Sequence, residues 1–405
     1  MIDTAIIAEN QTLTSRILLP NEKKVEREKV KNEKFFIGDS EYSSRKTFII
    51  AELGTSHDTD PVKAGELIEA AAEAGADCIK FQMVYAEEIL HPNTGEVVLP
   101  GGKIRLFDRF KELELPLSFF AEMKEKVEKR GLVFLCTPFG LKSARELRNL
   151  GPKCIKIASP ELNFSALLKE IASYKVSTLL STGVSKLGDI EDALEIINAY
   201  SPLPTPSSQI CLLHCVTAYP APENEYNLRV LGNLSSIFGL PVGISDHSLD
   251  PELIPVLGIT QGAIVIEKHF CLSKSDKGLD DPIALIPADF ARMTRAVRQA
   301  EKTGPDETLE TFYRERGRDL VDSILGDGVK RLAQAEKENY GRTNRSIHAL
   351  RNINKGEIIE KTMFASLRTE KILRPGLPPC WEDRIIGHRA RQYIPSGEGI
   401  RLEDI

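Results

Sequence analysis

Short apolar runs rich in β-branched residues alternate with amphipathic stretches from Thr47 onward. In the stretches between the runs, apolar positions recur every three or four residues, which is the pattern of a helix that follows each strand. The eight runs are residues 47–53, 78–83, 132–139, 154–159, 177–182, 210–216, 241–245 and 263–270. A strand–helix unit that repeats in this way predicts parallel strands joined by helical crossovers.

Eight such units favour a closed barrel over an open sheet. Together they occupy residues 47–302, close to the length of about 250 residues that is typical of a (β/α)8 TIM barrel. The alternative is an open doubly wound sheet, but no GxGxxG loop follows the first run. We therefore predict an α/β fold whose main domain is a TIM barrel.

The pattern is different on either side of the barrel. Residues 1–46 are polar and irregular and are interpreted as an N-terminal leader, and residues 303–343 are charged and predict a linker helix. Residues 344–405 consist of short segments with turns such as KGEII and SGEGI, which predict a small β-rich domain. A domain of about 60 residues has a marginal core, so we expect it to pack against a partner surface.

Composition excludes several classes of protein. The chain has 53 basic and 59 acidic residues, a net charge of -6, which argues against a nucleic-acid partner for the chain as a whole. Seven cysteines without a CxxC pair do not suggest a disulfide framework. We find no signal peptide and no apolar stretch long enough to span a membrane, and we expect a cytoplasmic protein.

Polar residues stand at the carboxyl end of every predicted strand, where a parallel barrel carries its chemistry. In chain order they include Glu52, Lys80, Gln82, Thr137, Lys156, Ser159, Glu161, Ser181, His214, Tyr219, Ser245, His247, Glu267 and His269. Each alone has a structural explanation, as a paired lysine, a hydrogen-bonded histidine or a helix cap. A structural explanation for all eight strands is harder, because buried lysines and histidines are costly unless they hold something.

The residue types indicate what these strand ends bind. Lys80 and Lys156, with several hydroxyl groups, suit a phosphate. Two histidines from adjacent strands, His247 and His269, suit a divalent transition metal with open coordination positions. The glutamates are suited to proton transfer or to binding hydroxyl groups. Phosphate, metal and polyol together exclude most proteins that bind apolar ligands.

A set of motifs carries a family resemblance. They are FIIAELG (48–54), AGADCIKFQ (74–82), CTPF (136–139), KIASPELN (156–163), LSTGVS (180–185), LLHCVTAYPAP (212–222), VGISDHSLD (242–250) and IEKHF (266–270). In this order the chain resembles the sialic acid (N-acetylneuraminate) synthase family, which includes legionaminate and pseudaminate synthases. The tail, with RSIHALRNINKGEII and RPGLPP, is similar to the family's SAF, or antifreeze-like, domain of the β-clip type.

The resemblance implies a transferase that condenses phosphoenolpyruvate with an N-acylated hexosamine such as N-acetylmannosamine. The products would be a nine-carbon 2-keto sugar acid and phosphate. The residues implied for phosphoenolpyruvate are Lys80, Thr137, Lys156, Ser159, Ser181 and Ser245, with Gln82 as a further substrate contact. The implied catalytic residues are Glu52, Lys80, Lys156, Glu161, His247 and Glu267. His247 and His269 would bind Mn²⁺ or Mg²⁺. Glu52 would transfer a proton, Glu161 would hold sugar hydroxyls, and Tyr219 and Asp280 would line the cavity.

The resemblance also implies a domain-swapped homodimer, in which an arginine of the small domain reaches the acceptor in the partner subunit. Arg368 and Arg374 are both candidates, with Arg368 favoured. The turn at residues 54–59, GTSHDT, differs from the family's GxNHxG, which bears on the identity of the acceptor. Residues 84–114 form an insert that is either a lid over the site or ordinary decoration of the barrel.

Two other functions remain open. One is a different phosphoenolpyruvate-dependent barrel synthase with a phosphorylated aldose acceptor, for which Lys103, Arg105 and Arg109 of the insert would supply positive charge. The other is a non-catalytic sugar-binding protein. Intact lysine, histidine and glutamate at the strand ends argue against this last class.

Overall fold

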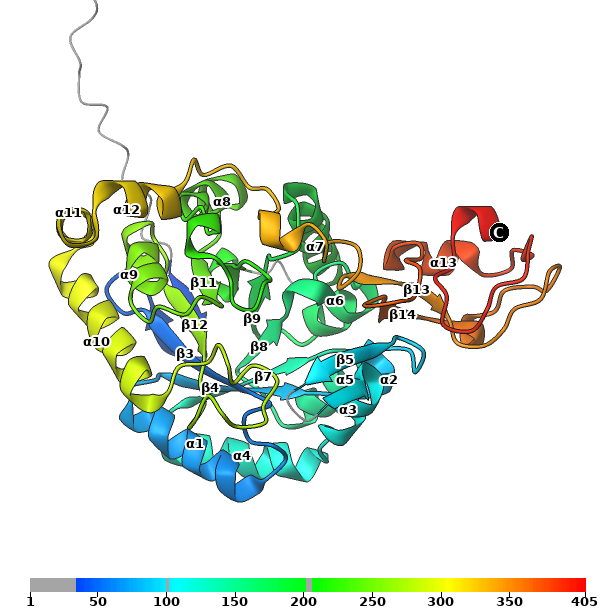
Figure 1. Cartoon of the computed structure of the whole chain (residues 1–405), viewed down its shortest axis with the longest axis horizontal. Helices are drawn as coiled ribbons and strands as arrows, with labels where there is room; N and C mark the ends of the chain where they lie inside the picture. The colour runs from blue at the N-terminus through cyan, green and yellow to red at the C-terminus, as the bar shows by residue number, and fades with distance from the viewer. Residues whose placement is uncertain (1–33, 100–101, 202–205) are drawn as a thin grey trace, which may run out of the picture. The chain divides into compact units, whose positions relative to one another are not determined.

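The computed structural model describes residues 34–99, 102–201 and 206–405, so most of the expected N-terminal leader lies outside the described residues. Its centre is an eight-stranded parallel sheet (Figure 1). The strands are β3 (Phe48–Gly54), β4 (Cys78–Met83), β7 (Val133–Pro138), β8 (Cys154–Ile157), β9 (Ser177–Ser181), β10 (Ile210–His214), β11 (Val242–Asp246) and β12 (Val265–His269). Their order is β7-β4-β3-β12-β11-β10-β9-β8, and the end strands β7 and β8 lie side by side, which curls the sheet into a barrel. The predicted fold class is confirmed.

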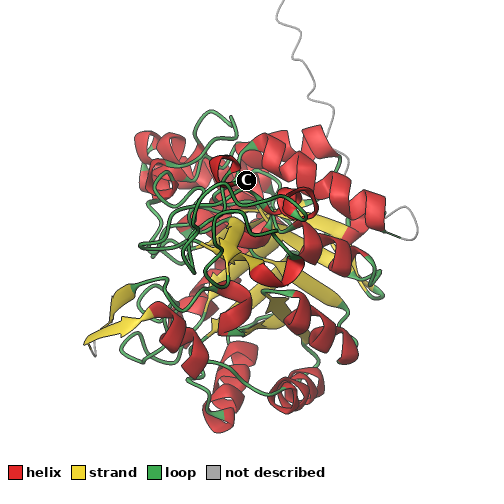
Figure 2. Ribbon diagram, turned by 90° about the vertical axis from the view of Figure 1, so that its right-hand side faces the viewer, coloured by secondary structure: helices red, strands yellow, loops and turns green. Residues whose placement is uncertain are grey.

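Helices surround the strands on the outside of the barrel (Figure 2). They are α1 (Pro61–Glu73), α4 (Leu117–Lys129), α5 (Leu141–Asn149), α6 (Ser165–Ala172), α7 (Leu187–Tyr200), α8 (Val230–Phe238), α9 (Leu253–Thr260) and α10 (Pro287–Thr303). The start of α1 shows why a helix begins where it does: the Asp60 side chain accepts a hydrogen bond from the Val62 amide at 2.8 Å, and Pro61 occupies the first position. The apolar faces of these helices and the outward faces of the strands form the main core.

A hairpin closes the amino-terminal end of the barrel. Strands β1 (Phe35–Ile37) and β2 (Ser40–Tyr42) pair antiparallel. Phe35, Ile37 and Tyr42 are buried against the inward residues at the starts of the barrel strands. Side chains therefore fill this end of the barrel. A cavity can form only at the opposite end, where the strands finish.

The insert after β4 has its own secondary structure. It contains helix α2 (Ala86–Ile89), the antiparallel strands β5 (Glu96–Leu99) and β6 (Gly102–Arg105), and helix α3 (Leu106–Glu112). The region after the barrel differs from expectation: instead of one linker helix it holds two, α11 (Pro305–Arg316) and α12 (Arg318–Leu325), and the short turn η4 (Gln334–Glu336). Gly304 lies between α10 and α11, and Gly317 lies between α11 and α12. Both have a positive φ, which L-residues rarely adopt, so glycine is the residue that fits each helix boundary.

The small domain has a core of its own. Strands β13 (Arg345–Ala349) and β14 (Phe364–Arg368) pair antiparallel, and η5 (Lys361–Met363), η6 (Pro379–Trp381), α13 (Glu382–Ile385) and η7 (Leu402–Asp404) complete it. Ile347, Ile353 and Phe364 are among the residues of its separate apolar cluster. Nowhere in the described ranges is there a helix with the length and apolar character needed to cross a membrane.

Candidate active site

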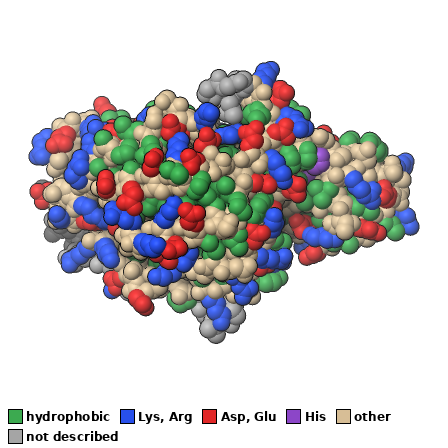
Figure 3. Space-filling view, turned by 90° about the horizontal axis from the view of Figure 1, so that it is seen from below, with side chains coloured by type: hydrophobic (Ala, Val, Ile, Leu, Met, Phe, Trp, Pro, Cys, Tyr) green, Lys and Arg blue, Asp and Glu red, His purple; other side chains and the backbone are tan. Residues whose placement is uncertain are grey.

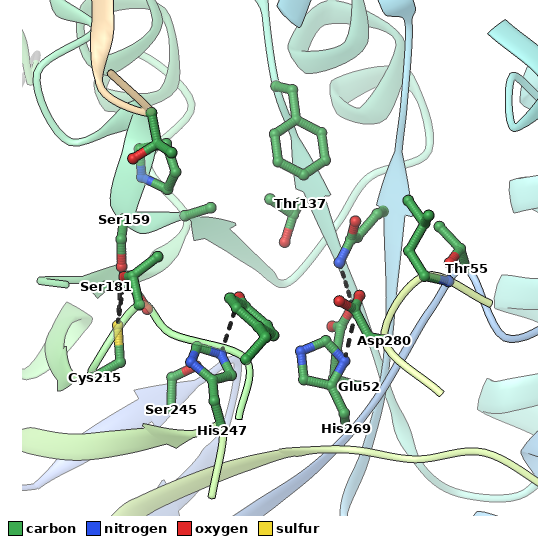
Figure 4. A pocket seen from close by; sticks show the side chains of 18 of the residues that line it. Glu52, Thr55, Thr137, Ser159, Ser181, Cys215, Ser245, His247, His269 and Asp280 are labelled. Atoms are coloured by element: carbon green, nitrogen blue, oxygen red, sulfur yellow. Dashed lines mark hydrogen bonds and ion pairs between the residues drawn. The ribbon is translucent and has the colours of Figure 1, made fainter. Parts of the chain in front are cut away.

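A cavity of about 350 Å³ opens at the carboxyl ends of the barrel strands (Figure 4). Most of the predicted site residues line it together, although they are scattered along the sequence. They are Glu52, Lys80, Gln82, Thr137, Lys156, Ser159, Ser181, Tyr219, Ser245, His247, Glu267, His269, Asp280 and Arg368. Parallel strands that end on one rim bring these residues together. Glu161 and Arg374 are not among the lining residues.

The floor of the cavity is a chain of buried ion pairs. Lys80 Nζ lies 2.7 Å from Glu52 Oε2 and 3.1 Å from Glu267 Oε2. Lys156 Nζ lies 2.9 and 3.1 Å from the two oxygens of Glu267. Gln82 donates to the other oxygen of Glu52 at 2.7 Å. Two ammonium groups and two carboxylates thus alternate in a space from which water is largely excluded.

The two carboxylates of the floor have different proton affinities. Burial alone would raise the pKa of Glu267, but Lys156 and then Lys80 hold that pKa well below its usual range. Burial raises the pKa of Glu52 against the lowering effect of Lys80, and the charge of Glu267 adds to the rise. Glu267 is therefore the fixed anion, and Glu52 is the carboxyl group that can gain or lose a proton.

Hydroxyl groups form the side wall next to the lysines. The Thr137 Oγ1 and Ser181 Oγ atoms are buried and have no hydrogen-bond partner among the described residues. Ser159 Oγ accepts from the Gly183 amide at 3.0 Å. Buried polar atoms are nearly always satisfied, so the two free hydroxyls indicate a polar ligand beside Lys80 and Lys156.

Gly183 lets the loop after β9 lie close to the hydroxyl groups of this wall. A Cβ atom at this position would lie 2.6 Å from Cys215 Sγ and 3.0 Å from Ser159 Oγ, distances that real Cβ contacts rarely or never show. Only glycine lets the loop after β9 approach the strand ends so closely, which accounts for the glycine of the LSTGVS motif.

His247 and His269 lie next to each other at one side of the cavity, as Figure 4 shows, with ring centroids 5.6 Å apart. His247 Nδ1 is 2.9 Å from the Val216 carbonyl oxygen, which can only accept, so Nδ1 carries the proton and Nε2 keeps a free lone pair. The Tyr219 hydroxyl lies 3.3 Å from that Nε2. Burial lowers the pKa of His247 to about 4 and that of His269 well below its usual value, so both rings are neutral at pH 7.

This pair fits a metal with open positions. Neutral imidazoles are the form that binds divalent transition metals, and the Val216 carbonyl oxygen orients one of the two rings, that of His247. Within the described part of the chain, no group of three or more histidine, cysteine, aspartate or glutamate residues is arranged for a metal ion.

A buried network behind the cavity holds His247 in place. The Tyr226 hydroxyl donates to Asp246 Oδ1 at 2.7 Å and accepts from the His247 amide at 2.8 Å. Asp246 also forms a fully buried ion pair with Lys268. His214 donates to the Tyr226 carbonyl oxygen at 2.6 Å and does not line this cavity.

Glu161 and the two candidate arginines occupy unexpected positions. The structure places Glu161 behind the cavity wall, where its Oε1 accepts from Arg368 at 2.7 Å and from Arg345 at 3.0 Å. This differs from the expectation that Glu161 faces the sugar. Arg368 lies in the cavity wall, whereas Arg374 binds Asp404 inside the small domain.

Sequence reasoning missed several lining residues. Phe139, Cys215 and Thr217 lie within the CTPF and LLHCVTAYPAP motifs, so the signal for them was present. Asn339 and Thr343 come from the segment expected to be a linker helix, and no pattern in the sequence directed them to the site. Other missed lining residues are Thr55, Phe110, Leu113, Glu370 and Lys371.

Comparison with known proteins identifies the chain. Residues 67–307 match the NeuB family, and residues 344–405 match the SAF domain. The chain belongs to the NeuB family. The N,N'-diacetyllegionaminic acid synthase of Campylobacter jejuni is 34% identical over 361 residues, which are 88% of this chain and 99% of that protein. A pseudaminic acid synthase of the same species is 31% identical over 366 residues, 89% of this chain and 97% of that protein.

A solved structure supports the same assignment. The spore coat polysaccharide biosynthesis protein SpsE of Bacillus subtilis has a TM-score of 0.76 and 31% identity, and the match covers 92% of this chain and 99% of that one. The predicted resemblance is therefore confirmed. This NeuB-family chain is an enzyme of the synthase, or transferase, type.

Proposed function

We propose that this NeuB-family enzyme condenses phosphoenolpyruvate with an N-acylated hexosamine to give a nine-carbon 2-keto sugar acid and phosphate. The observation that carries the proposal is the cavity floor, where Lys80 and Lys156 lie beside the unpartnered hydroxyls of Thr137 and Ser181. Two cations and free hydroxyl donors are what a phosphate and a carboxylate require. The relatives named as legionaminic and pseudaminic acid synthases agree with products of this class.

The charge balance of the floor suggests how an anion enters. Lys80 and Lys156 are neutralised by Glu52 and Glu267 when no substrate is bound. Because the pKa of Glu52 is raised, this carboxyl can take up a proton when phosphoenolpyruvate arrives and leave the floor with a net positive charge. We therefore assign Glu52 to proton transfer and Glu267 to holding the two lysines.

The proposed reaction forms one bond between carbons. C3 of phosphoenolpyruvate attacks the aldehyde carbon of the open-chain sugar, and the aldehyde oxygen takes up a proton to become a hydroxyl group. Water adds to the cationic C2 and loses one proton. The tetrahedral centre then collapses to the ketone: the new C2 hydroxyl gives up its proton, the bond from C2 to the phosphate oxygen breaks, and phosphate leaves. Lys80 and Lys156 hold the phosphate in position and stabilise its charge as it departs.

We propose that His247 and His269 hold Mn²⁺ or Mg²⁺. When bound there, the ion would polarise the aldehyde oxygen of the acceptor. Tyr219, whose hydroxyl is 3.3 Å from His247 Nε2, lies on the same side of the cavity and would contact the sugar.

The walls near the mouth suit an acetamido sugar. Phe110, Leu113 and Phe139 give apolar surface for methyl groups, while Asp280 and Arg368 offer polar contacts. The insert's cations do not favour a phosphorylated aldose acceptor: Arg105 pairs with Asp108, and Lys103, Arg105 and Arg109 are not lining residues. Lys371 does line the mouth, so a 6-phosphate is included in the test below.

The deciding experiment is an acceptor screen with phosphoenolpyruvate and Mn²⁺. It compares N-acetylmannosamine, its 6-phosphate and the diacetamido-dideoxyhexoses, with sugar-acid products measured by mass and phosphate release measured in parallel. We expect a nine-carbon acid with at least one unphosphorylated acceptor. No product with any of them would contradict the proposal and favour a non-catalytic sugar-binding protein.

We also propose a cytoplasmic homodimer that exchanges its small domains. None of the seven cysteines forms a disulfide, and six of them are buried, which suits a reducing compartment. Figure 3 shows acidic and basic side chains interspersed over the face in view, without the basic stripe that a nucleic-acid partner would need. In a single chain the small domain reaches its own barrel, and an exchange would repeat these contacts between two copies.

A further inference from the structure

Arg345, the first residue of β13, is a buried cation outside the cavity. Its side chain has no exposed surface, and it is the largest fully buried side chain among the described residues. Burial lowers its pKa to about 10, so it remains charged at neutral pH. A buried charge is costly unless hydrogen bonds and an opposite charge compensate for it. Its partners therefore show what it holds together.

The Arg345 guanidinium joins four segments next to Phe139 and Arg368, the part of the cavity wall that we assigned above to the acceptor and call the acceptor end. Its Nε and Nη2 donate to Glu161 Oε1, behind the end of β8, at 3.1 and 3.0 Å. It also donates to three backbone carbonyls: Glu88 in the insert, Phe139 after β7, and Ser366 in β14. The fork of the guanidinium uses every nitrogen, which an ammonium group could not do.

The backbone of Arg345 is fixed to the barrel as well. The Asn163 amide group donates to the Arg345 carbonyl oxygen at 2.9 Å, and its oxygen accepts from the Arg345 amide at 3.1 Å. The Asn163 side chain thus makes the two backbone hydrogen bonds that a neighbouring strand would otherwise make with Arg345. The start of the small domain is held on the turn that follows β8 by both side chain and backbone.

Arg368 depends on the same carboxylate. Its Nε and Nη2 donate to Glu161 Oε1 at 3.1 and 2.7 Å, while the side chain forms part of the cavity wall. The Glu161 carboxylate pairs with the guanidinium groups of both Arg345 and Arg368, so these three side chains together carry one positive charge. The position of Arg368 is set by Glu161, and the position of Glu161 is set by Arg345.

We propose that Arg345 is a positioning residue for the acceptor end of the site: it orients Glu161 and, through it, Arg368, without touching substrate. This inference rests on the proposed function for its kinetic readout. It also revises the part assigned to Glu161, which becomes the link between the two arginines. Among the described residues, the phosphoenolpyruvate end, formed by Lys80 and Lys156, shares no partner with Arg345.

The test is Arg345→Lys, which keeps the charge and removes the fork. We expect the KM for the acceptor to rise roughly tenfold and the KM for phosphoenolpyruvate to change less than twofold. Arg374→Ala is the matched control, because Arg374 pairs with Asp404 within the small domain and does not line the cavity. It should lower thermal stability without changing the ratio of the two KM values. Equal changes in both KM values in Arg345→Lys, or no change in either, would overturn the proposal.

A double mutant tests whether the effect passes through Arg368. In an Arg368→Ala background, adding Arg345→Lys should raise the acceptor KM by less than twofold, because the residue it positions is already gone. If the second substitution still produces its full tenfold effect, Arg345 acts by another route.

Hydrogen exchange separates this proposal from the proposed function. Arg345→Lys should increase exchange in residues 159–164 and 364–368 together, whether or not the chain turns over any sugar. If wild-type enzyme makes no product, the proposed function fails and the exchange result alone decides the positioning role; unchanged exchange would overturn it. If Arg345→Lys does not fold, Asn163→Ala removes only the backbone anchor and should change the same two segments and the same KM ratio to a smaller extent.

Discussion

At the scale of single residues, the site depends on charges that compensate one another inside a dry cavity. Glu267 accepts from Lys156 and from the Ser245 hydroxyl, the latter at 2.8 Å, and lies 3.1 Å from Lys80. Removing one member therefore leaves a buried charge without its partner, which costs more than the lost contact itself. Substitutions here should change substrate binding in ways that identify which end of the cavity each residue serves.

Lys156→Ala should weaken the binding of phosphoenolpyruvate. A hydrogen bond to a charged group contributes about 1.5–3 kcal/mol, which corresponds to a rise in KM of roughly 10- to 100-fold. Steady-state kinetics at fixed acceptor measures this. Lys268→Met is the control, since Lys268 is equally buried but pairs with Asp246 outside the cavity; it should reduce stability and leave the KM for phosphoenolpyruvate near the wild-type value. Unchanged kinetics in Lys156→Ala would rule out the phosphate site at this lysine.

His247→Ala should remove metal binding while the fold remains intact. Loss of a direct ligand should weaken Mn²⁺ by more than the 10- to 100-fold typical of losing an outer hydrogen-bond partner. Titration with Mn²⁺, together with turnover in chelator, checks this. The control is His348→Ala, which removes a buried histidine of β13 that bonds to the Gly397 carbonyl oxygen and does not line the cavity; this variant should bind metal as wild type does. Full activity of wild-type enzyme in chelator would refute the metal assignment.

At the scale of elements, the insert forms one wall of the mouth. Phe110 and Leu113, at the end of α3, line the cavity. Arg109 on the same helix donates to the Lys277 carbonyl oxygen at 3.0 Å and lies 3.9 Å from Asp58, so it ties α3 to the loops that follow β12 and β3. This connection supports the interpretation of the insert as a cover over the site.

Arg109→Ala should loosen that cover. Water would then reach phosphoenolpyruvate more readily, so phosphate released without sugar-acid formation should rise severalfold relative to product. Parallel assays of phosphate and sugar acid give the ratio. Arg105→Ala serves as the comparison, because Arg105 pairs with Asp108 at the surface and does not line the cavity. The interpretation fails if the two variants show the same ratio.

Elements and strand-end residues were largely predictable, and contacts between domains were not. Each barrel strand lies within its predicted run or within one residue of it, because alternation of apolar runs and helical stretches is a local signal. Residues at strand ends converge because the fold dictates it, which is why Lys80 and His269 could be placed in one site. The Arg345–Glu161 pair spans 184 positions and depends on how the small domain docks, for which a single sequence has no periodic signal.

At the scale of the whole molecule, the remaining question is which barrel each small domain serves. Glu161 accepts from Arg345 and Arg368 of the same chain. In an exchanged dimer the same pairs would form between copies, since swapping replaces a contact within one chain by the identical contact between two. The segment between α12 and β13, with Gly326, Gly328 and Gly341 all at positive φ, would be the hinge.

Mixing two impaired variants, assayed at substrate concentrations below the wild-type KM values, distinguishes these arrangements. Lys156→Ala impairs the barrel, and Arg368→Ala impairs the small domain's contribution to the wall. In a swapped heterodimer, the barrel with intact Lys156 receives the small domain with intact Arg368, so one site in two is complete. Random pairing puts half of the chains in heterodimers, and co-refolded protein should therefore regain about a quarter of the wild-type activity, which is the result we expect from the proposed homodimer. Each variant refolded alone fixes the baseline. If the mixture stays at that baseline although sedimentation shows dimers, each small domain serves its own barrel, and the contacts of Arg345 and Arg368 with Glu161 are made within one chain.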